Sequence, residues 1–398
     1  MARRASQRRM RRPHSHDYTV RPNANIPRSL FDRSYRRKQT LGSAGYLFPV
    51  YADFMFPGDV FVSRGNYYVR LATPLFPTMD DLHCIIEFFA VPCRILWSNW
   101  ERFMGAQDNP GDSTDFLVPQ VQTVLGYTDD GIGDYLGLPI GVPDMATSAL
   151  WHRAYNKIWN WHYRNQVIQD SVPENTDDGP DDVADYVLLR RQKRGDYFTT
   201  ALPYAQKGDP VALPLGDKAY VKGIGTQSAN AFSETLTSLV RESGNYPVTT
   251  FYEQSSAAGM GLLFARGGDT GADEEDWPDI YADLESATGA SINELRQASV
   301  VQRILERDAR SGTRYPEKVF AEFRVSVPDY RVQQPEFIGG GQFDISISAV
   351  PQTSESNPTG TPQGNLAGFG VGRGSAGFTY SAVEHMAVLG LASVRHIP

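Results

Sequence analysis

The chain has 398 residues, of which 41% are hydrophobic, which is enough for one large domain with long loops or for two to three ordinary domains. Its 20 Phe, 20 Tyr, 26 Pro and 36 Gly favour strands and long ordered loops over a helical bundle, and no apolar run approaches the roughly 18 residues of a membrane span. The net charge of −8 hides an asymmetry, because residues 1–38 carry 12 basic and 2 acidic groups whereas the rest carries 26 and 44.

Cysteine usage and the N-terminus bear on the compartment. Cys84 and Cys93 are the only cysteines, and two thiols do not make a disulfide framework in a chain of this size. The charged N-terminus has no apolar stretch behind it, so no signal peptide is visible. We therefore expect folding in a reducing cytoplasm.

Residues 1–38 are predicted to form a basic, partly disordered arm, because they lack apolar periodicity. A basic arm on an acidic body is typical of proteins that hold nucleic acid on one side. The alternative is a solvated tail that aids solubility. The candidate phosphate-binding residues are Arg3, Arg4, Arg8, Arg9, Arg11, Arg12, Arg36, Arg37 and Lys38.

Strand signals begin after the arm. Asp59–Val62 and Tyr67–Leu71 flank Ser63-Arg64-Gly65-Asn66, and this pattern predicts a hairpin or a strand–turn–strand. Ile85–Val91 is apolar on both faces except at Glu87, so it predicts a strand that is covered on both sides and closed by Pro92. We expect Glu87 to form an ion pair with an arginine such as Arg94 or Arg102.

A change of period after Pro92 predicts a helix. Leu96, Trp100, Phe103 and Met104 share one helical face, and Gly105 suits the position after the last turn. Two interpretations stay open for the aromatic side chains of this helix. They belong to the subunit's own core, or they anchor a contact between subunits. The candidate interface residues are Trp97, Trp100 and Phe103.

The middle of the chain predicts a helix over Leu150–Asn165. His152 and His162 lie too far apart for a helical zinc pair, so we expect them to pack or to form hydrogen bonds. The run Gln169–Asp185 is predicted to be a solvated acidic loop. A dense basic cluster then follows, which either faces packaged nucleic acid or pairs with acidic loops of a neighbouring subunit. It comprises Arg190, Arg191, Lys193 and Arg194.

The second half begins with Gly216–Ala290, which is rich in Ser, Thr, Gly, Ala and Asp and predicts an insertion that stands away from the core. A helix is expected over Ile292–Ala309. Alternation then predicts strands, with Gly339–Gly341 separating the first two of them. These strands are Phe320–Val327, Phe343–Val350 and a buried final strand at His385–Arg395.

No pattern for catalysis, metal or cofactor binding emerges. The sequence has no G-x-S-x-G, H-E-x-x-H or C-x-x-C motif, and its seven histidines are scattered. The glycines of Gly364–Gly377 lack the Lys-Ser/Thr and the strand-then-helix context of a phosphate-binding loop. We therefore expect no enzyme, no cofactor and no resident metal.

Several ordered motifs resemble the major capsid proteins of gokushovirus-type microviruses, which are small single-stranded DNA phages. They are EFFAVPCRILWSNWERFMG from Glu87, RRQKRGDYFTTALPYAQKGDPVALPLG from Arg190, LERDARSGTRYPE from Leu305, RVQQPEFIGGG from Arg331, PQGNLAGFG from Pro362 and GLASVR from Gly390. Their order along the chain makes the resemblance far more specific than any one motif.

The resemblance implies a mainly β fold, a single eight-stranded antiparallel jelly roll of the viral capsid type with long loops and a few short helices. It implies a jelly-roll domain over residues 39–398, with the insertion at about 216–290 forming a surface protrusion. Sixty copies would make a T=1 icosahedral shell around circular single-stranded DNA, assembled in the host bacterial cytoplasm. The protrusion would contact a host-surface receptor. No membrane span is expected.

Relatives of this type continue well past GLASVR with further strands, whereas this sequence ends in HIP. We therefore expect C-terminal strands of the jelly roll to be missing and a sheet edge to be exposed. An alternative function is a jelly-roll binding module for a host receptor or glycan. A jelly-roll enzyme is a third hypothesis, but it would need clustered His and acidic ligands.

Overall fold

The computed structural model describes residues 29–72, 80–211, 291–354 and 363–396, together with the backbone of six short strands between residues 220 and 283. The chain divides into two units, Met1–Leu41 and Gly42–Pro398. Residues 29–41 of the first unit have almost entirely exposed side chains. Within the described residues, every helix and strand belongs to the second unit.

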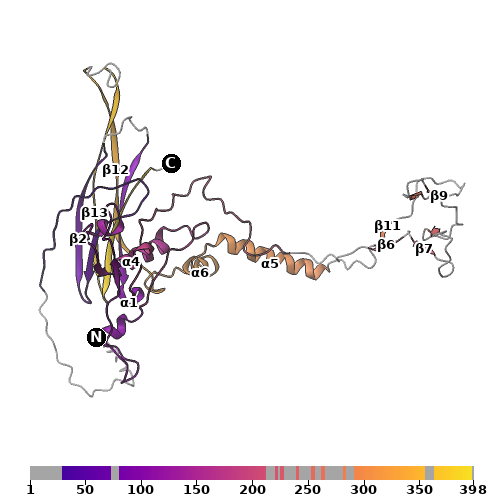
Figure 1. The fold of residues 1–398 in the computed structure, drawn as a ribbon, viewed down its shortest axis with the longest axis horizontal. Helices are drawn as coiled ribbons and strands as arrows, with labels where there is room; N and C mark the ends of the chain where they lie inside the picture. The colour runs from indigo at the N-terminus through magenta and orange to yellow at the C-terminus, as the bar shows by residue number, and fades with distance from the viewer. Residues whose placement is uncertain are drawn as a thin grey trace, which may run out of the picture. The chain divides into compact units, whose positions relative to one another are not determined.

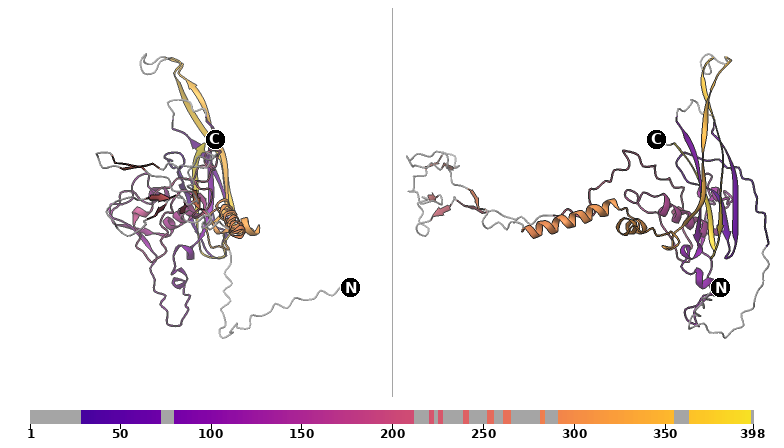
Figure 2. Two further views of the ribbon diagram at one scale, coloured as in Figure 1. Left: turned by 90° about the vertical axis from the view of Figure 1, so that its right-hand side faces the viewer. Right: turned by 180° about the vertical axis from the view of Figure 1, so that it is seen from behind.

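A six-stranded antiparallel sheet forms the scaffold of the second unit (Figure 1). Every neighbouring pair in it is antiparallel. In spatial order the strands are β1 (Phe48–Met55), β14 (Met386–His396), β3 (Leu82–Pro92), β12 (Glu336–Pro351), β13 (Leu366–Ser381) and β2 (Val60–Arg70). β12 and β13 continue as a pair beyond the ends of their neighbours (Figures 1 and 2).

Two-stranded ladders account for the other strands in the described residues. β4 (Gln120–Thr123) pairs with β5 (Met145–Ser148), which gives eight strands in the described part of the chain outside the insertion. Within the insertion the pairs are β6 (Tyr220–Lys222) with β11 (Tyr281–Asp283), β7 (Gly225–Gln227) with β8 (Leu239–Arg241), and β9 (Tyr252–Ser255) with β10 (Gly261–Phe264). The predicted protrusion at 216–290 otherwise lies outside the described residues.

The six-stranded sheet is curled, and one side chain contact demonstrates this. Three strands lie between β1, which carries Tyr51, and β13, which carries Phe378, yet the centroids of these two rings are 6.1 Å apart. In a flat sheet, four strand spacings would separate them by about 19 Å. The concave face therefore closes over its own core, which includes Met55, Phe88 and Phe343. The mainly β jelly-roll class expected from the sequence is confirmed.

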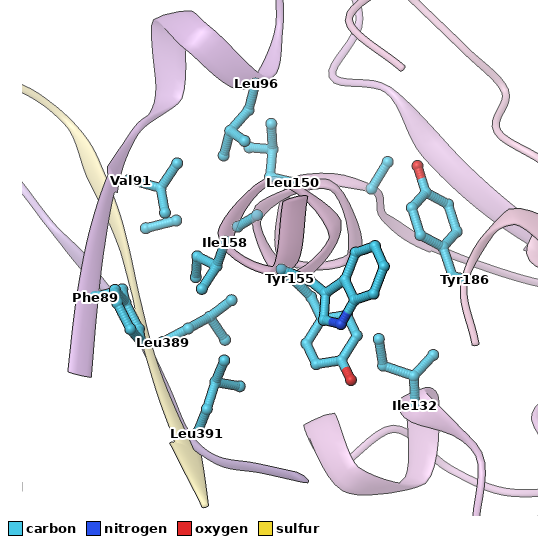
Figure 3. Close-up of a cluster of buried hydrophobic side chains, with 14 of the residues drawn as sticks. Phe89, Val91, Leu96, Ile132, Leu150, Tyr155, Ile158, Tyr186, Leu389 and Leu391 are labelled. Atoms are coloured by element: carbon cyan, nitrogen blue, oxygen red, sulfur yellow. The ribbon is translucent and has the colours of Figure 1, made fainter. Parts of the chain in front are cut away.

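The opposite face of the sheet is covered by helices and loops (Figure 1). Its core surrounds α4 (Leu150–Ile158), whose axis points toward the viewer in Figure 3. Phe89 and Leu389 approach the helix from β3 and β14, while Tyr186 closes the far side (Figure 3). The strand predicted over Ile85–Val91 is thus covered on both faces, as its sequence indicated, and it ends at Pro92.

The remaining helices are mostly short. They are α1 (Cys93–Leu96), α2 (Trp100–Phe103), α3 (Ile132–Leu136), a π-helical turn continuing α4 (Trp159–Tyr163), a 3-10 turn (Val183–Asp185), α5 (Ile292–Arg310) and α6 (Tyr315–Phe323). The predicted helices over Leu150–Asn165 and Ile292–Ala309 are confirmed. Among the described residues, no helix combines the length and the apolarity needed to cross a membrane.

One predicted helix is two. The periodicity over Leu96–Met104 suggested a continuous helix, but the backbone leaves helical geometry at Trp97, whose φ is −146° and ψ 119°. The amide of Ser98 donates to the carbonyl of Thr176 instead of to the preceding turn. A long-range backbone hydrogen bond therefore overrides the local period, and α2 restarts at Trp100. Gly105 has a φ of +92°, as expected after a last helical turn.

Two strand predictions were also wrong. The turn expected within residues 63–66 does not form, because β2 pairs with β13 without interruption from Val60 to Arg70. No strand forms over Phe320–Val327, because its first four residues are the last turn of α6. This helix starts with a proline in its first turn, and the Glu317 carboxylate accepts hydrogen bonds from the backbone amides that precede it. Local helix-start chemistry outweighs the alternation in this segment.

Gly339–Gly341 do not separate strands either, because they lie inside β12. A Cβ on Gly341 would stand 2.6 Å from the Ser375 carbonyl oxygen, and one on Gly340 would stand 2.6 Å from that of Ile86. Glycine here allows β12 to approach β13 and β3 closely where the sheet curls.

Candidate assembly surface and basic segment

Of the three predicted interface residues, Trp97 lies in the subunit's own core. Its side chain is fully buried, and its indole Nε1 donates to Asp178 Oδ1 at 2.6 Å. The same carboxylate oxygen accepts from Asn99 Nδ2 at 2.8 Å, and these bonds lower the pKa of Asp178. Trp97 is therefore not accessible to another subunit, whereas a subunit contact at Trp100 and Phe103 stays a prediction.

Trp100 and Phe103 line an apolar pocket of about 260 Å³. Phe103 is 36% exposed and the adjacent Met104 47% exposed, while the Trp100 ring lies 5.4 Å from that of His385. We refer to this feature as the apolar pocket. Its other lining residues are Phe54, Met55, Phe56, Val118, Ser148 and Leu150.

The loop that was predicted to be solvated and acidic is instead tied into the core. Asp181 is buried, and it accepts from Arg153 Nε at 2.7 Å and from Arg153 Nη2 at 2.5 Å. Arg153 also donates to the carbonyl oxygens of Leu96 and Asp177, at 3.0 and 2.9 Å. Tyr186 donates a further hydrogen bond to Asp181. A buried ion pair thus joins α4, α1 and this loop.

Glu87 forms the expected ion pair, but with neither of the expected arginines. Arg191 Nη1 lies 2.6 Å from Glu87 Oε2, and Tyr163 donates to the same oxygen at 2.6 Å. Arg94 is paired with Glu384 at 2.6 Å instead. Burial, together with the neighbouring carboxylate of Glu87, raises the pKa of Tyr163 well above its ordinary value. Arg191 thereby anchors the basic segment to β3.

The other members of the basic segment, Arg190 to Arg194, are exposed. The Arg190 guanidinium lies over the ring of Tyr46, at 4.7 Å from its centroid. Lys193 pairs with Asp196 at 2.6 Å. Arg194 forms no ion pair within the part of the chain that the structure describes. Arg190, Lys193 and Arg194 are therefore available to solvent and to polyanions.

Directly after the basic segment, an ordered turn carries two exposed aromatic side chains that were not predicted as site residues. Tyr197 is 90% exposed and Phe198 85% exposed. Asp196 fixes the turn by accepting from the amides of Phe198 and Thr199 at 3.0 and 2.7 Å. The hydrogen bond from Lys193 and those from the hydroxyl and amide of Thr199 lower the pKa of Asp196. The spacing Asp196-x-x-Thr199 around adjacent aromatics was the available signal.

The remaining predicted site residues fall in the N-terminal unit or outside the description. Arg36, Arg37 and Lys38 have exposed side chains. Outside the described residues lie Arg3, Arg4, Arg8, Arg9, Arg11 and Arg12, together with the side chains of the insertion that was predicted to meet a receptor. These assignments stay predictions.

His152 and His162 pack and form contacts inside the subunit, as expected, with His162 Nε2 2.8 Å from the carbonyl oxygen of Pro335. The His152 ring is buried and stacks on Tyr127, with 11° between the planes. Burial lowers the pKa of His152 to about 4, against smaller opposing effects of Ser148 and Asp181. Burial lowers the pKa of His162 in the same direction.

This predicts an acid sensitivity. Because the folded pKa of His152 lies below the ordinary value of 6.5, the unfolded chain binds the proton first, and stability falls as pH drops from about 6.5 toward 4. The loss amounts to roughly 3 kcal/mol at most, at 1.36 kcal/mol for each pKa unit. Urea unfolding at pH 7 and at pH 4 should show that His152→Phe reduces this loss. Equal losses in both proteins would contradict the assignment.

The curled antiparallel sheet, the exposed aromatics and the basic segment are the features of a structural protein that associates with other macromolecules. Comparison with known proteins gives its family. Residues 20–398 match the family model described as capsid protein (F protein), and the chain belongs to this family.

Three relatives are each named capsid protein VP1. The chain is 40% identical over 392 residues to that of Bdellovibrio phage phiMH2K, covering 96% of this chain and 72% of the relative. Against that of Chlamydia phage 1 it is 34% identical over 432 residues, covering 94% and 72%. Against that of Spiroplasma virus 4 it is 32% identical over 398 residues, covering 96% and 71%. The predicted microvirus major capsid protein is confirmed. This membership implies a structural role in the virion.

Proposed function

We propose that this capsid protein assembles into a T=1 icosahedral shell that encloses circular single-stranded DNA, and that assembly takes place in the cytoplasm of a bacterial host. The observation that carries the proposal is the display of large aromatic side chains on ordered segments of the subunit. Phe103, Tyr197 and Phe198 are all exposed, although the segments that carry them are fixed by hydrogen bonds.

Subunit contacts are the physical reason for such a display. Covering a large apolar side chain contributes roughly 1.5–3 kcal/mol, and aromatic anchors dominate the energetics of most interfaces. The rim of the apolar pocket and the turn at Tyr197 offer two different surfaces. An icosahedral shell needs contacts between different, complementary surfaces, because a contact between identical surfaces supplies only a twofold axis and not the threefold and fivefold axes.

We expect the subunit to bind DNA inside the shell, because many of its basic groups are concentrated in two short parts of the sequence. The arm carries a net +10 in residues 1–38, and the folded body is acidic apart from a few clusters such as Arg190–Arg194. Phosphate neutralisation by such groups requires no base contacts. The arm and this cluster would therefore hold DNA of any sequence.

Sedimentation and negative-stain microscopy of the purified protein test the assembly. We expect closed particles of one size, consistent with sixty subunits. Monomers alone, over a wide range of salt and protein concentration, would refute the proposal.

The DNA part has its own prediction. If the six arginines between Arg3 and Arg12 engage single-stranded DNA, replacing all six by Gln should weaken the dependence of log K on log salt by roughly 4, at about 0.7 for each phosphate. Fluorescence anisotropy with oligo(dT) at several NaCl concentrations measures this slope. An unchanged slope would show that these residues form only a solvated tail.

A further inference from the structure

A second, smaller pocket lies where the basic segment meets the end of β14. Its volume is about 150 Å³. We call it the basic pocket. Its polar lining side chains are Arg191, Gln192, Lys193, Arg194, Ser393, Arg395 and His396. Arg395 belongs to β14 rather than to the basic segment, and no local sequence pattern groups it with residues about two hundred positions earlier.

Backbone hydrogen bonds hold the two walls of the basic pocket together through Gly45. The amide of Gly45 donates to the carbonyl of Val394 in β14 at 2.9 Å, and its own carbonyl accepts from the amide of Arg191 at 2.8 Å. The amide of Gln192 donates to the carbonyl of Tyr163 at 3.1 Å. The backbone of the basic segment is therefore fixed against the end of β14 before any ligand arrives.

The cations in the basic pocket are only partly compensated. Arg191 is paired with Glu87, and Lys193 with Asp196. Within the described ranges, Arg194 and Arg395 have no acidic partner. The Nε of Arg395 is buried and has no hydrogen-bond acceptor. Burial and the neighbouring Arg191 lower the pKa of Arg395, while Glu87 opposes this. A buried N–H without an acceptor, beside a second unpaired guanidinium, favours an anion.

We propose that the basic pocket binds one phosphate group of the backbone of single-stranded DNA, held by Arg194 and Arg395. The proposal deepens the DNA-enclosing function proposed above and rests on it. Pockets that enclose a whole small molecule begin at about 300 Å³, so about 150 Å³ suits a phosphate group and leaves the sugar and base outside. An arginine guanidinium group can donate two parallel hydrogen bonds to two oxygens of one phosphate group.

Access to the basic pocket agrees with a ligand that arrives from solution. Arg194 and His396 are exposed at its mouth, whereas Ser393 is buried at its base. A strand of DNA can place one phosphate between them without entering further. The neighbouring acidic groups Glu87 and Asp196 are already committed to their own cations, so they oppose the ligand less than free carboxylates would.

The test uses the full chain and labelled oligo(dT) in fluorescence anisotropy. Arg194→Gln and Arg395→Gln should each weaken binding about tenfold, because each removes a charge-assisted contact. Arg303→Gln is the matched control. Arg303 is an exposed arginine on α5, outside the basic segment, and it does not line the basic pocket. We expect it to change the affinity less than about twofold. Equal losses in all three variants would overturn the pocket in favour of diffuse charge.

Inorganic phosphate provides a readout that does not depend on the variants binding DNA. It should displace oligo(dT) from the wild type more strongly than chloride at the same ionic strength, and it should raise the Tm of the wild type but not of Arg194→Gln. If phosphate and chloride act alike, the pocket does not select phosphate and the proposal fails. Because Arg194 is exposed, this variant leaves the core intact even if Arg395→Gln fails to fold.

Sedimentation of the same proteins separates the two proposals. Failure of the wild type to form particles, with the phosphate-selective binding intact, would refute the shell but not the anion site. Pocket variants that bind oligo(dT) normally but no longer assemble would mean that the basic pocket holds an acidic segment of another copy. That outcome would overturn the DNA assignment and leave the shell in place.

Discussion

Replacing Arg153 by Met is expected to lower the free energy of unfolding by about 3–5 kcal/mol, because it leaves the carboxylate of Asp181 buried without its cation. The loss also includes two hydrogen bonds to backbone carbonyls, those of Leu96 and Asp177. These carbonyls belong to α1 and to the acidic loop, so the variant should loosen both segments around α4. Urea unfolding followed by far-ultraviolet circular dichroism measures the change.

A double variant separates the pair from its surroundings. Arg153→Met with Asp181→Leu removes both charges, and it should recover a large part of the loss, because the desolvation cost of the isolated carboxylate disappears. Arg102→Met is the matched control, since Arg102 is half exposed and lies 3.6 Å from Asp108. It should change stability by less than about 1 kcal/mol. A double variant as unstable as Arg153→Met would show that packing, and not the unpaired charge, causes the loss.

The strands that alternate or that are apolar on both faces could be predicted from sequence, because each signal lies within a few residues. Ile85–Val91 and Phe343–Val350 are examples, and both lie inside longer strands of the same sheet. The family motifs added the jelly-roll class, which periodicity alone does not distinguish from other β folds. The strand predicted from Phe320 was wrong, because capping interactions that begin seven residues earlier make the start of this segment helical.

The candidate sites were harder to predict because they depend on pairing between distant segments. Glu87 was expected to find a nearby arginine, but its partner Arg191 lies 104 positions away. In the sequence Asp181 is one of several acidic residues in a loop, and only the fold shows that it pairs with Arg153 of α4. Arg395 joins Arg194 only because β14 ends beside the basic segment. No local pattern distinguishes these residues from their solvent-exposed neighbours of the same type.

Trp97 and Trp100 lie three positions apart, but truncation to Ala should affect the stability of the subunit much more at Trp97 than at Trp100. Trp97→Ala is expected to destabilise the subunit by about 3–5 kcal/mol, since it opens a cavity in the core and leaves Asp178 without the indole donor. Trp100→Ala should cost the monomer less, about 1–2 kcal/mol, because its half-buried ring lines the apolar pocket instead of filling the core. Urea unfolding of both variants gives the comparison.

At a temperature where both variants are folded, Trp100→Ala should impair assembly more than Trp97→Ala does, which is the reverse of their order in stability. Trp100→Ala removes part of the wall of the apolar pocket and should abolish particles in sedimentation, whereas any Trp97→Ala subunits that remain folded keep this wall and should still assemble. Phe103→Ala, on the same rim, should behave like Trp100→Ala. If Trp100→Ala loses stability and assembly in equal measure, α2 belongs to the core alone, and the subunit contact must lie elsewhere, with the turn at Tyr197 as the next surface to test.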